Sequence, residues 1–399
     1  MNDFSRLDAL LRKFVDDGLP GCSCMVARKG EVLFEGYYGM ADIEKGVPLG
    51  PEHVFRQASL TKVALYTTLM MLYEQGRYLM SDPLYEYFPE WRHSKKIVKK
   101  DNGETVCVET DKPVTVKNIM NFTCGLPYAM IIGGMSVSHP TAAAMRRAME
   151  PLEKKGHYTL REQIRAMAEV PQAFEPGERH LYGFSSELAA GMLEALCGKS
   201  AELVIREMLF EPLGMDSSAN FLFGDLGERL VGDYVLKPGK KLGDPGALGL
   251  MSEEREKAMV GPLGEVSGFQ RVITNCRDYT KLMQMLANGG VYAGERIMGR
   301  KTIDLMRTNT LTPLQIREDF TNNYLAGYGY GYGVRTMMDR HAGHHNGSLG
   351  AFGWTGGSGT WAESDPEEGV SIVYMHNLMP NMEEYHHLRM RAAAYGALE

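Results

Sequence analysis

Several sequence features that mark particular classes of protein are missing from this chain of 399 residues. No stretch approaches 18 consecutive apolar residues, so we expect no membrane-spanning helix. Arginine and lysine form no stripe or tail, and the net charge is −7, which makes nucleic acid an unexpected partner. The short basic run at 95–100 is typical of a solvated surface turn. No internal repeat or low-complexity segment is present.

The cysteines also carry no sign of a disulfide framework or a redox motif. The six of them are scattered, and none belongs to a C-x-x-C pair. The first residues, MNDFSRLDALLRKFVDDG, have the spacing of an amphipathic helix and not the composition of a secretion signal. Together these observations predict reduced thiols and a cytoplasmic protein.

Residue patterns for metal binding are equally sparse. His341, His344 and His345 form an H-x-x-H-H cluster, but the further histidine or acidic spacing typical of a metallohydrolase is missing. We interpret the cluster as part of a surface loop, and we expect neither a metal nor a cofactor.

The chain does have the composition of an ordinary globular protein, with 44% apolar and 23% charged residues. Its length allows a large core and more than one lobe. Periodicity predicts strands at 23–28, 31–39, 331–338, 351–363 and 369–377, and helices at 60–76, 145–154, 160–169, 186–196, 201–210, 276–287, 301–308 and 381–399. This order favours one sheet domain formed by 1–76 plus 328–399, with a mainly helical domain, 77–327, inserted into it. The least regular stretch, 216–265, is a candidate covering loop.

Ser59-Leu60-Thr61-Lys62 is the only S-x-x-K in the sequence, and it opens the strongest predicted helix. Residues three apart share a helix face, so the spacing places an amine beside a hydroxyl. A serine needs a base to become a nucleophile, and a lysine can be that base if burial or nearby cations keep it neutral. The helix N-terminus adds free N–H groups that suit an oxyanion. The alternative is a helix N-cap serine followed by a solvated lysine.

Two further segments carry candidate functional residues. In the first, a Pro-Gly turn at 176–177 leads to Tyr182, just before a helix predicted to begin at 185–186. There the hydroxyl could point into a cleft and relay a proton, although most tyrosines are packing residues. In the second, the predicted strand at 350–361 contains glycines that a strand disfavours. Such glycines indicate close approach by a ligand or backbone, or else a bulged edge strand.

With these segments in view, the chain resembles a known family, the serine β-lactamase and penicillin-binding-protein superfamily. It is most similar to the class C side, and nearest to the carboxylesterases of that fold. The resemblance covers almost the whole chain, in the segments LPG 19–21, GMAD 39–42, ASLTK 58–62, DP 82–83, FPE 88–90, CGLP 124–127, PGERHLY 176–182, PLGMD 212–216, WTG 354–356 and DPE 365–367. It implies an α+β (β-lactamase-like) fold. In that fold a central antiparallel sheet from the N- and C-terminal segments is flanked by helices, with an inserted mainly helical domain.

The resemblance also implies roles for individual residues. Ser59 would be the nucleophile and Lys62 its base partner, as in the S-x-x-K motif of β-lactamases and penicillin-binding proteins. Tyr182 would be the family's tyrosine, and Trp354-Thr355-Gly356 would be its strand motif, usually K-T-G or H-x-G. The oxyanion hole would consist of the backbone N–H groups of Ser59 and Gly357.

Two positions depart from the lactamase pattern. Phe184 replaces the asparagine of Y-x-N, and Trp354 replaces a cation. In lactamases those groups help to hold the substrate's amide and carboxylate. An aromatic pair can line an apolar acyl pocket but cannot bind a carboxylate by charge, so the departures favour an esterase. His345-Asn346-Gly347 is a second candidate for the H-x-G motif.

From these residues we predict a cytoplasmic serine hydrolase that cleaves small carboxylic esters through an acyl-enzyme on Ser59. Its partner would be a small-molecule ester or amide substrate. We expect it to bind neither nucleic acid nor a membrane, and the sequence does not define its oligomeric state. Three alternatives stay open. They are acyl transfer to a small-molecule acceptor, β-lactamase or D-amino-acid peptidase activity, and a non-catalytic binding module of the same fold.

Overall fold

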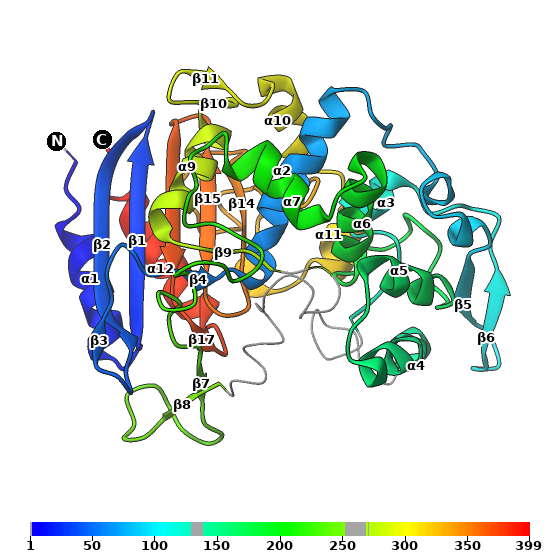
Figure 1. Ribbon diagram of the computed structural model, residues 1–399, viewed down its shortest axis with the longest axis horizontal. Helices are drawn as coiled ribbons and strands as arrows, with labels where there is room; N and C mark the ends of the chain where they lie inside the picture. Colours follow the sequence, from blue (N-terminus) through cyan, green and yellow to red (C-terminus); the bar gives the residue numbers. More distant parts are fainter. Residues whose placement is uncertain (1, 129–138, 252–268, 270) are drawn as a thin grey trace.

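The computed structural model of the chain describes residues 2–128, 139–251, 269 and 271–399 (Figure 1). Its α-helices are α1 (Ser5–Asp16), α2 (Thr61–Glu74), α3 (Val116–Met120), α4 (Pro140–Lys155), α5 (Leu160–Ala168), α6 (Ser185–Cys197), α7 (Ala201–Ile205), α9 (Cys276–Ala287), α10 (Arg300–Met306), α11 (Pro313–Asp319) and α12 (Glu383–Tyr395). Shorter helical turns are η1 (Ala58–Leu60), η2 (Leu84–Glu86), η3 (Pro89–Arg92), the π-helical η4 (Arg206–Phe210) and η5 (Asn323–Leu325).

The strands are β1 (Gly21–Arg28), β2 (Glu31–Asp42), β3 (Val47–Pro48), β4 (Phe55–Arg56), β5 (Lys95–Lys99), β6 (Thr105–Glu109), β7 (Tyr234–Leu236), β8 (Leu248–Leu250), β9 (Ile273–Thr274), β10 (Val291–Tyr292), β11 (Glu295–Arg296), β12 (Tyr328–Tyr330), β13 (Arg335–Met337), β14 (Phe352–Thr355), β15 (Trp361–Asp365), β16 (Val370–Met375) and β17 (Leu378–Met379).

An eight-stranded antiparallel sheet is built from both ends of the chain (Figure 1). Its strand order is β12-β13-β14-β15-β16-β1-β2-β3, so β1 from the first fifty residues pairs with β16 from the last thirty. The two chain ends also meet, because the Glu399 N–H donates to Asn2 Oδ1 at 3.0 Å. The predicted fold class is therefore confirmed, with a central antiparallel sheet of N- and C-terminal strands flanked by helices.

Helices cover both faces of this sheet. Helices α1 and α12 pack together on one face, where Leu11 and Phe14 of α1 join Cys22, Cys24 and Val26 of β1 in one buried cluster. Helix α9 packs on the other face, against β1, β15 and β16. Because β1 is covered on both sides, almost all its residues are buried, and the strand is apolar on both faces.

Helix α2 lies between the sheet and the helical part of the molecule (Figure 1). It contacts α6, α10 and β14, and nearly all of its residues are buried. This explains its sequence, which is apolar on every side, as expected of a helix in a core. The same packing places the first turn of α2, with Lys62, in the interior of the protein.

The middle of the chain is mainly helical but not wholly separate from the sheet. It contributes the β5–β6 hairpin and the β7–β8 pair, and its α9 packs on the sheet itself. The division into 1–76 plus 328–399 and 77–327 accordingly stays a prediction. Of the candidate covering loop, 252–265 lies outside the described residues, and 216–251 contains β7 and β8. All six cysteines are free. Within the described ranges, none of the helices combines the length and apolar character needed to cross a membrane.

Two predicted strands are wrong in extent. The predicted strand 351–363 is two strands, β14 and β15, joined by a turn at 356–360, and β14 is not an edge strand because β13 pairs with it. The predicted strand 331–338 contains the turn and the second strand, β13, of a second hairpin that β12 and β13 form. In both places glycines that periodicity assigned to a strand occupy a turn, which follows from their freedom in φ. The predicted helix at 60–76 is α2, but Ser59 itself lies in η1.

Candidate active site

Ser59, the candidate nucleophile, lies in the 3-10 turn directly ahead of α2. Ala58 precedes it with φ of 46°, in the left-handed region that non-glycine residues rarely adopt. The backbone around the strained residue is fixed, because the Gln57 N–H donates to Val272 O at 2.9 Å and the Leu60 N–H donates to Gln57 O at 2.9 Å. Such strain persists where surrounding structure imposes it, and it is frequent at functional sites.

Lys62 is the second residue of α2, directly after that turn, and is only 1% exposed. Its amine is 3.3 Å from Ser59 Oγ and 4.9 Å from the centre of the Tyr182 ring. Burial and, to a smaller extent, the charge of Arg271 lower the pKa of Lys62 to about 7, against the opposing effect of Glu187. A large fraction of Lys62 is therefore free amine at neutral pH and can accept a proton from Ser59. The alternative of a solvated lysine is wrong.

Tyr182 is the third side chain at this point. Its hydroxyl hydrogen bonds with the Ser59 side chain and accepts a hydrogen bond from Trp354 Nε1 at 3.1 Å. Its ring stacks on Phe122 with centroids 4.9 Å apart. Burial raises the pKa of Tyr182 well above its usual range, so the phenol is neutral at neutral pH. Of the two partners of Ser59, Lys62 is thus the better base, and Tyr182 is suited to passing a proton on.

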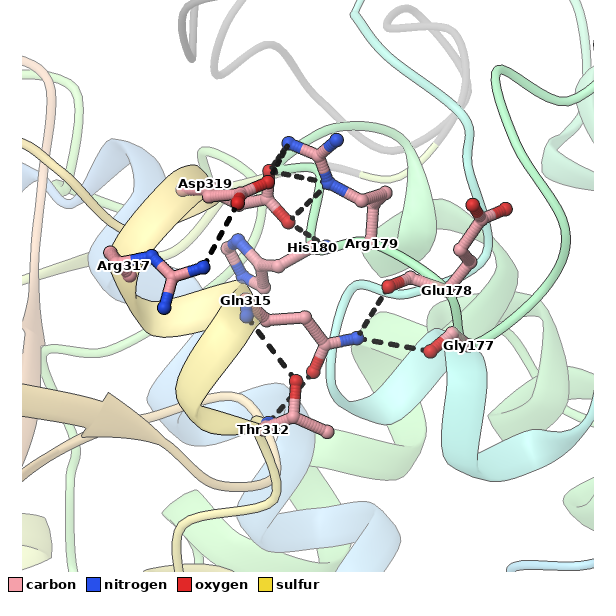
Figure 2. Close-up of polar contacts among 9 residues, drawn as sticks. Gly177, Glu178, Arg179, His180, Thr312, Gln315, Arg317 and Asp319 are labelled. Carbon is pink, nitrogen blue, oxygen red and sulfur yellow. Dashed lines mark hydrogen bonds and ion pairs between the residues drawn. The ribbon is translucent and has the colours of Figure 1, made fainter.

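Helix α11 anchors the segment that leads to Tyr182 (Figure 2). Gln315 Nε2 donates to the carbonyls of Gly177 and Glu178 at 3.0 and 3.1 Å. Asp319 accepts from Arg179 Nε at 2.8 Å and from the His180 backbone N–H at 3.0 Å. Four successive residues of the segment are therefore fixed from one helix, which restricts where the following tyrosine can point.

The end of β14 lies against the residues just before Ser59, and it carries the candidate strand motif Trp354-Thr355-Gly356. A Cβ on Gly356 would lie 2.4 Å from Gln57 O and 2.1 Å from Thr360 Oγ1, so the backbones meet too closely for any other residue. The Thr360 hydroxyl also donates to Gln57 O at 3.1 Å. The glycine at this point of the strand motif therefore reflects close backbone approach, one of the two explanations that the sequence left open.

The turn after Gly356 leaves the Gly357 N–H without an acceptor among the described residues. The Gly356 N–H donates within the turn at 2.7 Å, and Ser358 O accepts from the Leu378 N–H at 2.8 Å. Between them Gly357 is exposed, and in the described part of the chain neither its N–H nor that of Ser59 donates a hydrogen bond. Two unpaired donors on adjoining segments are what an oxyanion hole requires, and Gly357 and Ser59 keep that role as a prediction.

An aromatic wall extends from Tyr182 in both directions. Its ring lies 5.4 Å from that of Trp354 and 5.8 Å from that of Tyr128, and Tyr128 in turn lies 5.0 Å from Phe184. The two residues that depart from the lactamase pattern, Phe184 and Trp354, therefore belong to one set of rings around the tyrosine. Such a wall offers an apolar surface to an acyl chain.

The sequence interpretation missed an ion pair at this site, with a buried glutamate and a part-buried arginine. Glu187, in the first turn of α6, is 3% exposed and accepts from Arg271 Nη2 at 2.6 Å. Burial by itself raises the pKa of Glu187, but the charges of Arg271 and Lys62 outweigh it and hold that pKa below its usual range. No local pattern marks these residues, although Glu187 lies only five positions after Tyr182.

The rival H-x-G motif at His345-Asn346-Gly347 has other contacts. His345 is 5% exposed, its Nε2 lies 3.0 Å from Glu363 Oε1, and the same oxygen accepts from the Tyr395 hydroxyl at 3.1 Å. The interpretation of His345 as a surface-loop residue is wrong, whereas His341 and His344 are exposed. Nowhere in the described ranges do three or more histidine, cysteine, aspartate or glutamate side chains gather as a metal site.

Glu363→Gln is expected to lower the free energy of unfolding at pH 7 by about 3–5 kcal/mol, because it removes the buried carboxylate that balances the buried charges of Arg335 and Arg391. Although burial raises the pKa of Glu363, His345 and two arginines outweigh it and hold that pKa at about 2. A lowered folded-state pKa stabilises the protein above the unfolded-state pKa of about 4.3. The difference between wild type and variant should therefore shrink as pH falls from about 4 towards 2.

Urea denaturation at several pH values measures this effect. A difference that is equally large at low pH would show that the charge of Glu363 contributes nothing. Ester turnover by the folded variant should stay at the wild-type level, since Glu363 contacts none of the candidate catalytic side chains.

Comparison with known proteins adds four matches. The sequence model described as Beta-lactamase matches residues 7–397. Protein Rv1367c of Mycobacterium tuberculosis (strain ATCC 25618 / H37Rv) is 25% identical over 382 residues, covering 94% of this chain and 90% of that protein. Esterase EstB of Burkholderia gladioli is 27% identical over 212 residues, 53% of this chain and 50% of EstB. Among solved structures, EstCE1, a hydrolase with promiscuous acyltransferase activity, has a TM-score of 0.77 and 21% identity, with 98% of each chain covered.

Proposed function

The chain belongs to the Beta-lactamase family of hydrolases, and from that premise we propose that it is a serine hydrolase cleaving small carboxylic esters through an acyl-enzyme on Ser59. The observation that carries the proposal is the contact of Ser59 Oγ with two proton carriers, the buried Lys62 amine and the Tyr182 hydroxyl. A serine with a neutral amine beside it meets the requirement for an activated nucleophile.

In the acylation step, Ser59 Oγ forms a bond to the ester carbonyl carbon, and its proton passes to Lys62 Nζ. The carbonyl oxygen becomes an oxyanion, which the N–H groups of Ser59 and Gly357 stabilise. The bond from carbon to the alcohol oxygen then breaks. The leaving oxygen takes a proton from the Tyr182 hydroxyl, which regains one from Lys62, so an alcohol departs and both side chains return to their starting states.

Deacylation repeats these steps with water. A water oxygen bonds to the acyl carbon, its proton passes to the Lys62 amine, and the bond from carbon to Ser59 Oγ breaks with return of a proton to the serine. The products are the carboxylic acid and the free enzyme, with no change in oxidation state.

The expected substrate has an apolar acyl group and no carboxylate at the strand motif. Trp354 stands where lactamases carry a cation, and it faces other rings. The nearby cation, Arg335, is 3% exposed, and its guanidinium lies 5.9 Å from the Trp354 ring. It is therefore buried among aromatic side chains and not presented to a substrate.

We expect a preference of at least about a hundredfold for p-nitrophenyl butyrate over a chromogenic cephalosporin, compared by kcat/KM on one preparation. A carboxylate desolvated without a partner costs several kcal/mol, and each 1.4 kcal/mol is about tenfold in rate. Equal or better turnover of the cephalosporin would reject the esterase assignment in favour of β-lactamase or D-amino-acid peptidase activity.

Trp354→Lys should shift this ratio towards the lactam because it restores a cation at the motif. Trp354→Phe is the matched control, since it keeps an aromatic ring without charge and should keep the preference for the ester. A ratio that Trp354→Lys leaves unchanged would argue that Trp354 is not at the substrate-binding position.

Acyl transfer to a small alcohol is the second candidate function, favoured by the similarity of the whole fold to EstCE1, whose description names that activity. It differs from hydrolysis only in the group that attacks the acyl-enzyme. Product analysis with added acceptor alcohols distinguishes the two.

A chromogenic ester that gives neither a burst nor steady turnover would indicate a non-catalytic binding module. The cytoplasmic location and the small-molecule ester or amide partner stay predictions.

A further inference from the structure

The ion pair of the buried Glu187 with the part-buried Arg271 lies beside the start of α2, next to the candidate nucleophile and base. Glu187 belongs to the first turn of α6, and α6 packs on α2. Arg271 comes from the segment just before β9 and donates from Nη2 to Glu187 Oε1 at 2.6 Å. The two charges therefore connect α6 to a distant segment across the start of α2, and the acylation and deacylation steps above use neither of them.

Backbone hydrogen bonds fix Arg271 at this place. The next residue, Val272, donates its N–H to Thr61 Oγ1 at 2.9 Å and accepts at its carbonyl from the Gln57 N–H at 2.9 Å. Gln57 and Thr61 lie on either side of Ser59 in the sequence. The strand pair β4–β9 continues the connection. Arg271 is therefore one residue away from a segment bonded to both sides of the nucleophile turn.

The carboxylate of this pair is fully hydrogen bonded and the guanidinium is not. Glu187 accepts at Oε2 from the Ser186 hydroxyl at 2.9 Å in addition to Arg271. Arg271 Nη1 is buried and has no hydrogen-bond partner among the described residues. The positive charge of this guanidinium is therefore less compensated by hydrogen bonds than the negative charge of the carboxylate.

Lys62 is the neighbour on which this field acts. Its amine contacts Ser59 Oγ and the face of the Tyr182 ring, and Arg271 and Glu187 are the charged residues that influence it within the described structure. The neutral Tyr128 phenol lies near both members of the pair. Because Lys62 and Glu187 are buried, where the effective dielectric is low, neighbouring charges change the protonation of the amine strongly.

We propose that Glu187 and Arg271 are positioning residues that set the protonation state of Lys62, with Arg271 favouring the free amine and Glu187 favouring the ammonium ion. The proposal rests on the proposed function, because it concerns the base that activates Ser59. It gives the pair a role in the reaction rate that is separate from any role in stability.

The two members should act in opposite directions. Arg271→Gln removes a cation, so Lys62 keeps its proton to a higher pH and the acid limb of the activity profile moves to higher pH. Glu187→Gln removes an anion, so the acid limb moves to lower pH. Each shift should be about one pH unit, and the double variant should lie between the two single variants. Simple loss of a structural contact would lower the rate in both variants without moving the limbs apart.

The experiment measures the rate at which a fluorophosphonate probe labels Ser59 between pH 5 and pH 9, followed by mass spectrometry. Because the label stays on the serine, the measured rate does not depend on deacylation. Glu90→Gln is the control. Glu90 of η3 pairs with Arg161 of α5 at 2.6 Å, so this variant makes the same change in charge at a different ion pair, away from Glu187 and Arg271. Its acid limb should coincide with the wild type.

Charge-retaining variants keep the test decisive where a glutamine variant fails to fold. Glu187→Asp and Arg271→Lys should both retain limbs close to the wild type. The proposal is overturned if the acid limbs of the two glutamine variants coincide with the wild type, or if both limbs move in the same direction. Absence of any labelling at Ser59 in the wild type would instead overturn the proposed function, so the two failures are distinguishable.

Discussion

Replacing Ser59 with alanine is expected to reduce ester turnover by about 10⁴-fold or more, because the covalent intermediate can no longer form. The Ser59 hydroxyl contacts both the Lys62 amine and the Tyr182 hydroxyl, the two groups that can carry its proton. Substrate binding should survive, since the aromatic wall and the two backbone N–H groups are unchanged. Turnover of p-nitrophenyl butyrate by wild type and variant, on preparations of equal folded content, measures the loss.

A fluorophosphonate probe identifies the nucleophile independently. It should add one label per chain, which peptide mapping places at residue 59. Ser200→Ala is a matched control, because Ser200 caps α7 by accepting from the Leu203 N–H and has no contact with the site. That variant should keep both label and turnover. A label at another residue, or unchanged turnover in Ser59→Ala, would refute the assignment.

Elements defined by their own local signals could be predicted from the sequence. Helix α9 was predicted at 276–287 and spans those residues, because its apolar spacing is regular and Asn275 caps it by accepting from the Asp278 N–H. The adjacency of Ser59 and Lys62 was predictable for the same reason, since it depends only on helical spacing. Tyr182 and Trp354 lie far from them in the chain, and only the family resemblance brought them to the same site.

Features that depend on distant contacts could not be predicted. The turn that divides 351–363 into two strands is held by Gln57 and Leu378, which a local pattern does not show. The left-handed Ala58 is imposed by the bonds around it, and nothing in its side chain indicates the strain. Glu187 and Arg271 meet only because α6 packs on α2 and because Val272, next to Arg271, hydrogen bonds to Thr61 at the start of α2.

Lys62 and Tyr182 are expected to act with Ser59 as one unit, so their mutational losses should not multiply. Each of Lys62→Ala and Tyr182→Phe should reduce turnover by about 10²–10⁴-fold, the range of general acid–base catalysis. Once one proton carrier is absent, the relay between serine and leaving group is broken, and removing the other should cost little more. The double variant should therefore be close to the more damaged single variant.

Measured kcat/KM values of the four enzymes in this double-mutant cycle decide the matter. Tyr182→Phe retains the ring that stacks on Phe122 and lies under the Lys62 amine, so its loss reports the hydroxyl. Lys62→Met is the control for Lys62→Ala, because it fills the buried space without an amine and should be equally inactive. If the losses multiply, Lys62 and Tyr182 serve separate steps, and a direct path from Ser59 to Lys62 without the tyrosine becomes the better account of how the serine is activated.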